Sequence, residues 1–433
     1  MITGLGLMIC SKAYIDYTTS GLENPLTYLL IVIFFIIYFS ETKNLKNLFF
    51  LIFVAALGIL NRLDTMLIFA PPILFYLIKA RKIKGWFKAV LWSISPVVLW
   101  ELFSLFYYGF LFPNTAYAKL STGISQSLLI KEARFYYFHS LLLDPETLVV
   151  ISIALICMFF MKERSTIPIG IGIILYLGYT IKIGGCFMSG RFFTAPFLCA
   201  VIIISRLTLE EIKFAMFPFL LFIMLMGIIN PYSPIHSGAD YAEPVPINAQ
   251  VSDERDVYYK SAGLLQYKPG IEMPTAQLAR DGRNIRRKKK KFAMAGSIGF
   301  MGYFAGPDVF ILDIFALTDP LLARLPIMDG RKWHIGHFGR ALPLGYKETV
   351  KTGTNKLYDP NLKLYYSKLS HIIKGPLFSW SRIKEIINMN LGKYDDILAI
   401  YTQNPINIPF SNLQQTFTAG RSWSDDGVHM FTH

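Results

Sequence analysis

The sequence predicts a polytopic α-helical membrane domain, with about eight full spans and a partial one, followed by an extracytoplasmic α/β domain. Apolar and aromatic residues make up 53% of the 433-residue chain and charged residues only 17%, which is too apolar for a soluble protein of this length. The long apolar runs lie in 1–230, whereas 231–433 carries Pro, Asn, Asp and Lys throughout. We therefore set the domain limits at 1–230 and 231–433, and the second domain is large enough for its own core.

Eight apolar stretches approach the ~20 residues that a helix needs to cross a bilayer. They lie near 23–40, 46–61, 65–79, 86–108, 147–161, 166–182, 191–206 and 213–230. The stretch 125–142 is amphipathic and is expected to lie in the membrane interface. The stretch 1–12 is too short to cross and lacks the basic start and cleavage site of a signal peptide, so we interpret it as the end of a helix whose beginning is absent.

The basic residues predict which connections face the cytoplasm, because short cytoplasmic loops are rich in Lys and Arg. Alternate connections hold such clusters: Lys43 and Lys46; Lys79, Arg81, Lys82, Lys84 and Lys88; Lys162 and Arg164; Arg206 and Lys213. The remaining connections and everything after 230 then face outward. Since these basic residues flank apolar spans and no recognition motif accompanies them, we exclude a nucleic-acid partner despite the net charge of +14.

Four stretches on the predicted outer side carry conspicuous polar residues. They are 13–25 (AYIDYTTSGLENP), 61–64 (NRLD), 107–120 (YYGFLFPNTAYAKL) and 184–191 (GGCFMSGR). We expect them to meet in one cleft at the outer membrane surface, covered by the C-terminal domain.

Charged side chains in the first two of these stretches are candidates for catalysis. Asp16 and Glu23 either belong to a helix-capping loop or orient a sugar hydroxyl. Arg62 and Asp64 either form an interfacial salt bridge, or Arg62 clamps a phosphate while Asp64 holds Arg62 or accepts a proton. Charged groups at membrane depth that face a cavity are usually functional, which favours the second interpretation for Arg62 and Asp64.

The other two stretches supply candidates for binding a sugar phosphate. Pro113 is expected to end a helix, and the residues that follow it could line such a pocket, namely Asn114, Tyr117 and Lys119. Gly184 and Gly185 allow positive φ or a close backbone approach. Arg191 either extends to the headgroups as an ordinary interfacial side chain or binds a lipid phosphate.

In the C-terminal domain, FAMAG (292–296) and VFILDIFAL (309–317) are strand candidates on either side of a short helix. Asp313 lies near the carboxyl end of the second strand, where parallel sheets gather ligands. His334 and His337 are three residues apart without further ligands, so His337 is interpreted as structural or sugar-contacting. The four cysteines all precede residue 230 and form no paired metal motif, and no metal site is predicted.

The ordered set of polar stretches resembles the GT-C class of bacterial integral-membrane glycosyltransferases. The closest likeness is to the terminal β-(1→2)-arabinofuranosyltransferase family of the mycobacterial cell wall and its bacterial relatives. The residues that carry the likeness are YTTSGLENP (17–25), NRLD (61–64), FPNTAYAKL (112–120), GGCFMSGRFF (184–193), LDIFALTDPLLARLP (312–326) and HIGHFGRALP (334–343). They span most of the chain.

The resemblance implies an inverting transferase, multi-pass in the bacterial cytoplasmic membrane with the C-terminal domain outside. A polyprenyl-phosphate sugar would enter from the membrane lipid, and its phosphate would be the leaving group. A carboxylate would deprotonate the hydroxyl of a cell-envelope glycan or lipid-linked acceptor. No cofactor is certain, and whether a divalent cation assists is left open.

The chain departs from that family at two points. Cys186 stands where relatives usually carry an acidic residue. The family's expected catalytic aspartate lies before the position of Met1, so Asp64, Glu23 and Asp16 are the carboxylates left as candidates for its role. These departures keep open an inactive, truncated relative that binds glycans at the membrane. A transporter or channel is disfavoured because the spans form no repeated half.

Overall fold

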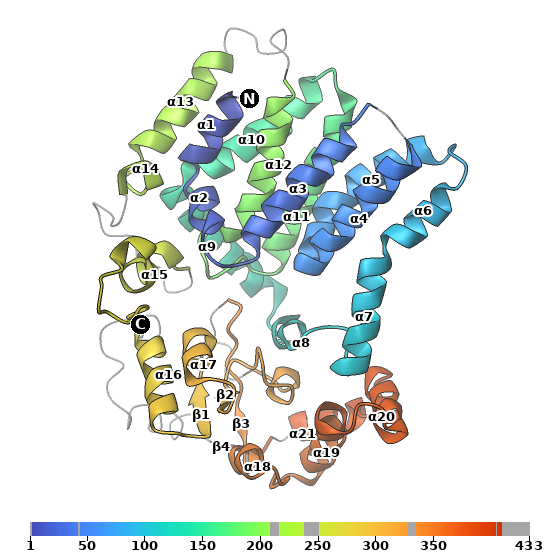
Figure 1. The fold of residues 1–433 in the computed structure, drawn as a ribbon, viewed down its shortest axis with the longest axis vertical. Helices are drawn as coiled ribbons and strands as arrows, with labels where there is room; N and C mark the ends of the chain where they lie inside the picture. The colour runs from blue at the N-terminus through green and yellow to red at the C-terminus, as the bar shows by residue number, and fades with distance from the viewer. Residues whose placement is uncertain are drawn as a thin grey trace. The chain divides into compact units, whose positions relative to one another are not determined.

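The computed structural model describes residues 2–41, 44–120, 122–207, 216–237, 251–327, 335–403 and 405–408 (Figure 1). The chain forms two compact units: one comprises 1–100 and 126–260, the other 101–125 and 261–433. These limits differ from the predicted domain limit at 230. Residues up to 260 group with the first helices, and 101–125 groups with the C-terminal residues.

The first unit is a bundle of helices. Its longer elements are α1 (Ile2–Cys10), α2 (Lys12–Thr18), α3 (Asn24–Tyr38), α4 (Leu45–Asn61), α5 (Met66–Ala80), α6 (Trp86–Ser93), α9 (Gln126–Leu143), α10 (Pro145–Phe160), α11 (Ile167–Lys182), α12 (Thr194–Ser205), α13 (Met216–Ile229) and α14 (Pro234–Ser237). Three single turns join them, η1 (Leu63–Thr65), η2 (Arg164–Thr166) and η3 (Arg191–Phe193). Two helices, α7 (Ser95–Tyr107) and α15 (Glu254–Ala262), cross the limit between the units.

Capping residues set where several of these helices begin. The side chain of Asp144 accepts a hydrogen bond from the Thr147 amide (3.3 Å) at the start of α10. Pro145 follows at the first helical position. An N–H at this position would have no partner within the helix, so the helix loses no hydrogen bond to proline there. Asn44 caps α4 in the same way through the Asn47 amide (2.8 Å).

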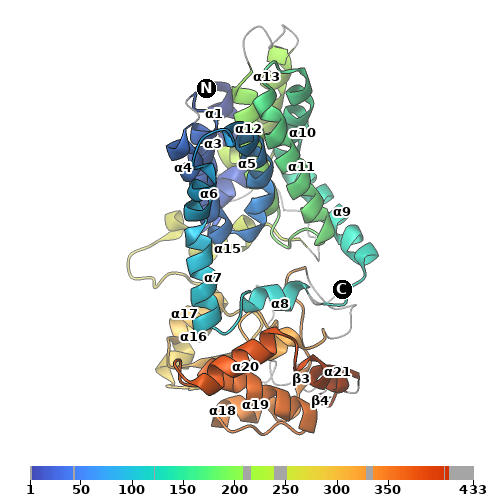
Figure 2. The same ribbon diagram turned by 90° about the vertical axis from the view of Figure 1, so that its right-hand side faces the viewer.

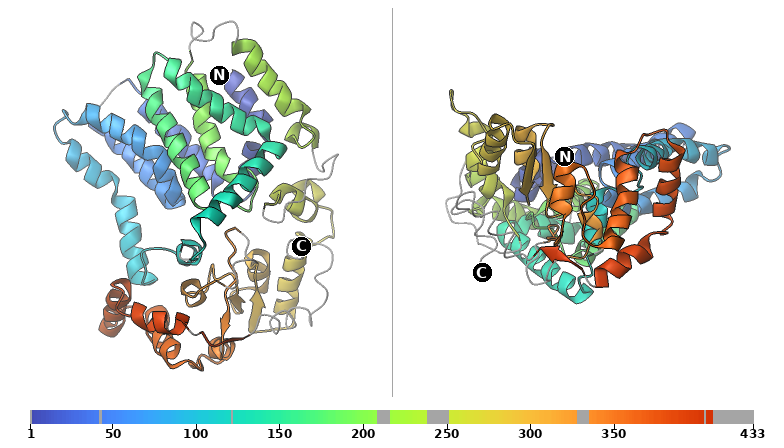
Figure 3. Two further views of the ribbon diagram at one scale, coloured as in Figure 1. Left: turned by 180° about the vertical axis from the view of Figure 1, so that it is seen from behind. Right: turned by 90° about the horizontal axis from the view of Figure 1, so that it is seen from below.

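Among the described residues, three helical segments are long and apolar enough to cross a membrane, judged by length and composition: Leu63–Ala80, Trp86–Tyr107 and Arg164–Lys182. A fourth is added if α9 and α10, which meet at a bend of 106° (Figure 3), form one span. Helices Asn24–Tyr38, Leu45–Asn61 and Arg191–Ser205 are apolar but shorter. A helix therefore coincides with each of the eight predicted stretches, but within the described ranges three or four have the length to span by themselves. The predicted amphipathic segment is the helix α9.

The core of this unit is formed where α3, α4, α5, α11 and α12 pack side by side (Figures 1 and 2). The buried rings of Phe34 on α3 and Phe69 on α5 have centroids 4.6 Å apart. Gly172 of α11 lies against the backbone of Ile68, where an added Cβ would approach the Ile68 carbonyl oxygen to 2.7 Å. This close approach positions the loop before α5, and with it Arg62 and Asp64.

The second unit is mostly helical. Its helices are α8 (Asn114–Leu120), α16 (Gln277–Arg287), α17 (Gly299–Ala305), α18 (Tyr346–Thr352), α19 (Pro360–Lys374), α20 (Trp380–Asn390) and α21 (Asp395–Gln403), with turns η4 (Leu264–Gln266) and η5 (Leu322–Arg324). Its strands are β1 (Phe292–Ala295), β2 (Phe310–Asp313), β3 (Leu342–Pro343) and β4 (Asn407–Ile408).

The predicted pair of parallel strands is confirmed. Strand β1 pairs with β2 in register Phe292↔Phe310 to Ala295↔Asp313, so Asp313 is the last residue of its strand. The sheet of this pair has two strands, and β3 and β4 form a separate two-stranded antiparallel sheet. The predicted α/β domain is thus a helical unit with a small parallel sheet.

Two buried arginines connect 101–125 to the C-terminal part of the second unit. Arg340 donates to the carbonyls of Ala118 (2.7 Å), Phe338 (3.0 Å) and Leu322 (3.2 Å). Arg382 donates to the carbonyls of Ile372 (2.7 Å), Phe106 (2.8 Å) and Tyr107 (2.9 Å). Each guanidinium therefore satisfies main-chain acceptors that a purely apolar core would leave without partners.

Asp319 makes the stability of the second unit depend on pH. It is 3% exposed and accepts hydrogen bonds from the amides of Leu321 and Leu322 and from the Tyr346 hydroxyl. Burial raises its pKa to about 6, although these donors oppose the rise. Because the folded state then binds this proton more tightly than the unfolded chain, stability is gained as the pH falls through 6 and is absent above it.

We expect the free energy of unfolding of the parent protein, relative to Asp319→Asn, to rise by about 2–3 kcal/mol between pH 7 and pH 4. Denaturant unfolding in detergent at several pH values measures this difference. Asp308→Asn, at an exposed carboxylate of the same unit, is the control for the loss of one carboxylate. A parent-minus-variant difference that is flat with pH would show that Asp319 has the same pKa in the folded and unfolded states.

Candidate functional site

Two arginines and two carboxylates form an ion-pair network in the first unit. Arg62 binds Asp64 through two bonds, from Nε (2.7 Å) and Nη2 (2.6 Å), and binds Glu23 through Nη1 (2.5 Å). Nη2 of Arg191 lies 2.8 Å from both oxygens of Glu23. None of the four side chains is more than 20% exposed. The predicted meeting of 13–25, 61–64 and 184–191 is therefore observed at these residues.

The sequence positions each member of the network at a helix end. Glu23 immediately precedes α3, and its carbonyl accepts a hydrogen bond from the Asn61 side chain (3.0 Å), which also binds Thr27 (2.8 Å). Arg62 ends α4 in an extended conformation, so its side chain leaves the helix axis at the start of η1. Arg191 begins η3 directly after Gly190, whose φ of +73° turns the chain.

Aromatic and sulfur groups surround the two guanidiniums. The Tyr176 hydroxyl donates to Asp64 (3.1 Å), and the Arg62 guanidinium carbon lies 4.5 Å from the centroid of the Phe192 ring. Nη1 of Arg191 lies 3.3 Å from the Met188 sulfur. Among the described residues, Nε of Arg191 is buried without a hydrogen-bond partner. A buried donor that is left without a partner destabilises the fold.

The electrostatics of the network favour the ionised form of Glu23. Burial alone would raise the pKa of Glu23, but the charges of Arg191 and Arg62 outweigh it and hold this pKa below its usual value. With both arginines and both carboxylates ionised, the network is neutral.

A second group of charges surrounds Asp16. Lys12 forms an ion pair with Asp16 and with Asp253 (2.8 Å), and Arg255 approaches Asp16 to 3.3 Å. Burial raises the pKa of Asp16 against the opposing charge of Lys12.

Main-chain bonds join the Asp16 group to the loop that carries Arg191. The Tyr17 hydroxyl donates to the Ser189 carbonyl (3.0 Å). The amide of Ser189 donates to the Ser252 carbonyl (2.9 Å), and the amide of Ser252 donates to the Phe187 carbonyl (2.7 Å). The residues after Ser252 therefore add Asp253 and Arg255 to the same end of the helical unit.

The glycines of GGCFMSGR adopt the conformations that the sequence predicts. Gly184 has φ +87° and Gly185 φ +84°. A Cβ on Gly185 would lie 2.6 Å from Cβ of Tyr136, so this position also has the predicted close approach. Cys186 is 7% exposed, and its sulfur accepts a weak bond from the Met188 amide (3.4 Å). A thiol there cannot balance Arg191 as a carboxylate would.

The predicted residues of the stretch 107–120 lie in the second unit. Asn114 donates to the Thr318 carbonyl at 3.4 Å, and the guanidinium carbon of Arg324 lies 4.2 Å from the centroid of the Tyr117 ring. Lys119 occupies the last turn of α8. Their joining with the arginine network in one cleft stays a prediction.

The predicted residues of the C-terminal motifs also lie in the second unit. Asp313 is 1% exposed and accepts from the amides of Phe315 (2.9 Å) and Thr318 (3.0 Å), so it organises the turn after β2. His337 packs against the Phe315 ring, with centroids 5.1 Å apart. His334 lies outside the described residues. Within the described ranges, no group of three or more His, Cys, Asp or Glu side chains is placed to hold a metal ion.

Sequence reasoning missed Tyr176, Lys12, Asp253 and Arg255 as members of these charge networks. Lys12 and Asp16 are four apart, a spacing that brings helical side chains together, so their pair had a local signal. Tyr176 lies within an apolar span, and its hydroxyl group was the only sequence signal that it could join a polar network. Arg255 is 239 residues from Asp16, and no local pattern could have joined them.

Comparison of the chain with known proteins finds no matching family model, no matching curated protein and no matching solved structure.

Proposed function

We propose that the chain is a membrane glycosyltransferase of the GT-C type. It would move a sugar from a polyprenyl-phosphate donor onto a cell-envelope glycan or lipid-linked acceptor, outside the bacterial cytoplasmic membrane. One observation carries the proposal: the guanidiniums of Arg62 and Arg191 converge on Glu23 beside helices that could span a membrane. Two guanidiniums at one point suit a phosphate, which they bind in planar, two-point geometry.

In this proposal the donor phosphate binds Arg191. The network is neutral, so an incoming phosphate displaces Glu23 from one guanidinium. Arg62 is held by two bonds to Asp64, whereas Arg191 has Glu23 as its carboxylate partner and an Nε without one among the described residues. Nε and Nη2 of Arg191 then form the two-point edge that binds the phosphate of the donor.

Asp16 suits the role of general base better than the other two candidates. All three candidates have cationic partners, which for Asp16 are Lys12 and Arg255. The two guanidiniums at Glu23, however, lower its pKa. The raised pKa of Asp16 makes it a better proton acceptor near neutral pH. Asp16 would take the proton of the acceptor hydroxyl while that oxygen attacks the anomeric carbon and the bond to the phosphate breaks.

We expect Arg191→Lys to raise the KM for the donor about ten-fold with kcat nearly unchanged, because one of two phosphate contacts is lost. Asp16→Asn should lower kcat by about 100-fold or more. The assay follows release of polyprenyl phosphate by full-length protein in liposomes, from radiolabelled polyprenyl-phosphate pentose or hexose with an envelope glycan. Arg206→Lys, at the more exposed pair with Glu163, is the matched control. Transfer with an unchanged KM in Arg191→Lys would contradict the assignment.

A second candidate function is glycan binding without transfer. It is favoured by the pairing of all three candidate carboxylates with cations, and by Cys186 at the position where the family it resembles usually carries an acidic residue. In that case the protein binds the polyprenyl-phosphate sugar or the glycan, but neither the pentose nor the hexose donor releases polyprenyl phosphate. Absence of binding by both ligands would contradict both candidates.

A further inference from the structure

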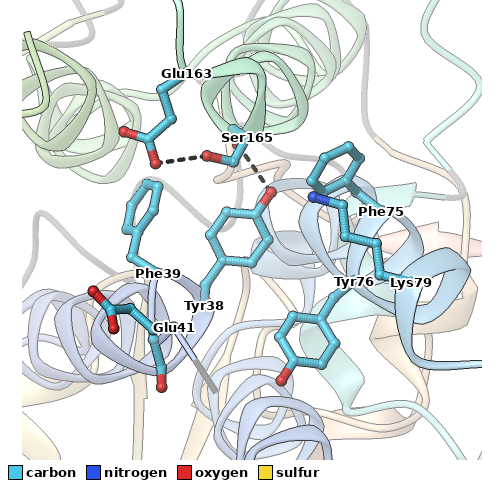
Figure 4. A pocket seen from close by; sticks show the side chains of 9 residues that line it. Tyr38, Phe39, Glu41, Phe75, Tyr76, Lys79, Glu163 and Ser165 are labelled. Atoms are coloured by element: carbon cyan, nitrogen blue, oxygen red, sulfur yellow. Dashed lines mark hydrogen bonds between the residues drawn. The ribbon is translucent and has the colours of Figure 1, made fainter. Parts of the chain in front are cut away.

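A pocket of about 230 Å³ lies in the first unit, where α3 and α5 end and α10 turns into α11. The side chains that line it come from the segments 38–41, 75–79 and 163–165 (Figure 4). The Tyr38 hydroxyl donates to the Ser165 carbonyl (2.9 Å), which fixes one wall. Because Glu23 precedes α3 and Tyr38 ends it, the pocket and the arginine network lie at opposite ends of this helix, about 20 Å apart.

The pocket offers one positive and one negative group for a ligand. The Lys79 ammonium lies 4.2 Å from the centroid of the Phe75 ring. Glu41 lies on the other side of the pocket in Figure 4, with the ring of Tyr38 between them. Among the described residues, neither Glu41 nor Lys79 has an ion-pair partner, and both are exposed at the mouth.

The remaining charge at the pocket is already neutralised. Glu163 accepts from Nε (2.9 Å) and Nη2 (3.2 Å) of Arg206 and from the Ser165 hydroxyl (2.8 Å). The Arg206 guanidinium in turn covers the ring of Phe39 at 4.7 Å. A simple anion would be repelled by Glu41 and a simple cation by Lys79. The lining is therefore complementary to a zwitterion.

We propose that this pocket binds a zwitterion that carries a phosphate and a primary ammonium, of the kind found in the headgroup of a phosphatidylethanolamine lipid. The phosphate accepts from Lys79, and the ammonium donates to Glu41 beside the aromatic ring of Tyr38. At about 230 Å³ the pocket is smaller than the roughly 300–1,000 Å³ of typical sites for drug-sized ligands, which suits a headgroup and leaves the acyl chains outside.

The location supports a lipid as the source of this chemistry. The pocket lies at the ends of apolar helices, and Lys79 is the last-turn cation of the candidate span Leu63–Ala80. Headgroups of a surrounding bilayer lie at that level, and basic pockets between membrane helices bind them. The inference rests on the membrane location of the first unit and not on the transfer reaction, so the two proposals fail independently.

Native mass spectrometry of the full-length protein in detergent tests the proposal, with phosphatidylethanolamine, phosphatidylglycerol and phosphatidylcholine of identical acyl chains as probes. We expect phosphatidylethanolamine to bind most tightly, because phosphatidylglycerol lacks the ammonium and phosphatidylcholine has no N–H to donate. Lys79→Ala and Glu41→Gln should each weaken its binding about ten-fold. Lys82→Ala and Glu348→Gln, which change exposed charges outside the lining, should leave binding unchanged.

Water-soluble phosphoethanolamine distinguishes the two sources of the ligand. Weak binding of the soluble compound identifies the lipid as the ligand, whereas binding as tight as that of the lipid identifies a soluble zwitterion with the same chemistry. Equal binding of phosphatidylglycerol, or binding that survives both Lys79→Ala and Glu41→Gln in variants with unchanged thermal unfolding, would overturn the proposal.

Discussion

Replacing Glu23 by glutamine is expected to lower the free energy of unfolding of the first unit by about 3 kcal/mol or more. Glu23 is the shared partner of Arg62 and Arg191, and its side chain and theirs are at most 20% exposed. The substitution keeps the shape of the side chain but leaves Arg191 without a carboxylate and Arg62 with Asp64 alone. Removing one partner from a buried ion pair costs much more than the pair itself contributes, because the remaining charge is left poorly solvated.

Glu163→Gln is the matched control for Glu23→Gln. It removes the carboxylate of another Arg–Glu pair in the same unit, but Arg206 is 45% exposed and Glu163 is 32% exposed. Solvent screens such a pair, so the expected cost is below about 1 kcal/mol. Denaturant unfolding of both variants in lipid-free detergent measures the difference. Equal costs at the two sites would contradict the view that Glu23 holds two desolvated guanidiniums.

The Glu23→Gln variant also separates stability from ligand binding. If a phosphate replaces Glu23 at Arg191, polyprenyl phosphate should restore stability to the variant more than it stabilises the parent, because the variant needs no carboxylate displaced. Thermal unfolding with increasing polyprenyl phosphate measures this recovery. If polyprenyl phosphate stabilises the variant no more than it stabilises the parent, phosphate binding at Arg191 would be contradicted and the network would have a structural role.

Local patterns predicted the parts of this molecule that depend on near neighbours. The apolar runs located the helices, and the two strands around Gly299 were recognised from their apolar residues. The paired glycines before Cys186 predicted positive φ because few other residues adopt it. Arg62 and Asp64 were recognised as a pair because both lie in a short connection between apolar runs.

Long-range packing decided what the sequence could not. The division of the chain was predicted at the end of the apolar runs, yet 101–125 groups with the C-terminal residues through Arg340 and Arg382. These buried arginines bind main-chain carbonyls, which every residue has, so the sequence contains no partner that could reveal the contact. The grouping of Asp16 with Arg255 depends in the same way on backbone hydrogen bonds of Ser252, which accepts from the Ser189 amide and donates to the Phe187 carbonyl.

Gly185→Ala is expected to destabilise the first unit by about 3 kcal/mol or more, the second large effect that the structure predicts. Two costs combine at this position. Its φ of +84° is one that alanine adopts only with strain. The added methyl group would also lie 2.6 Å from Cβ and 2.7 Å from Cγ of Tyr136. These atoms are next to the backbone, so a rotation of the Tyr136 side chain cannot remove the clash. Tyr136 is itself fixed, since it is fully buried, stacks on Phe193 and accepts a hydrogen bond from the Phe192 amide.

Gly21→Ala separates the two costs. Gly21 has φ +72°, but no atom lies within 4 Å of the position that its Cβ would take. Its substitution should therefore carry the conformational cost alone, about 1 kcal/mol. The difference between the two variants in denaturant unfolding then measures the close approach of GGCFMSGR to α9. If Gly185→Ala costs no more than Gly21→Ala, the loop can move away from Tyr136. Arg191, six residues further along, would then not be held in place for a phosphate by this packing.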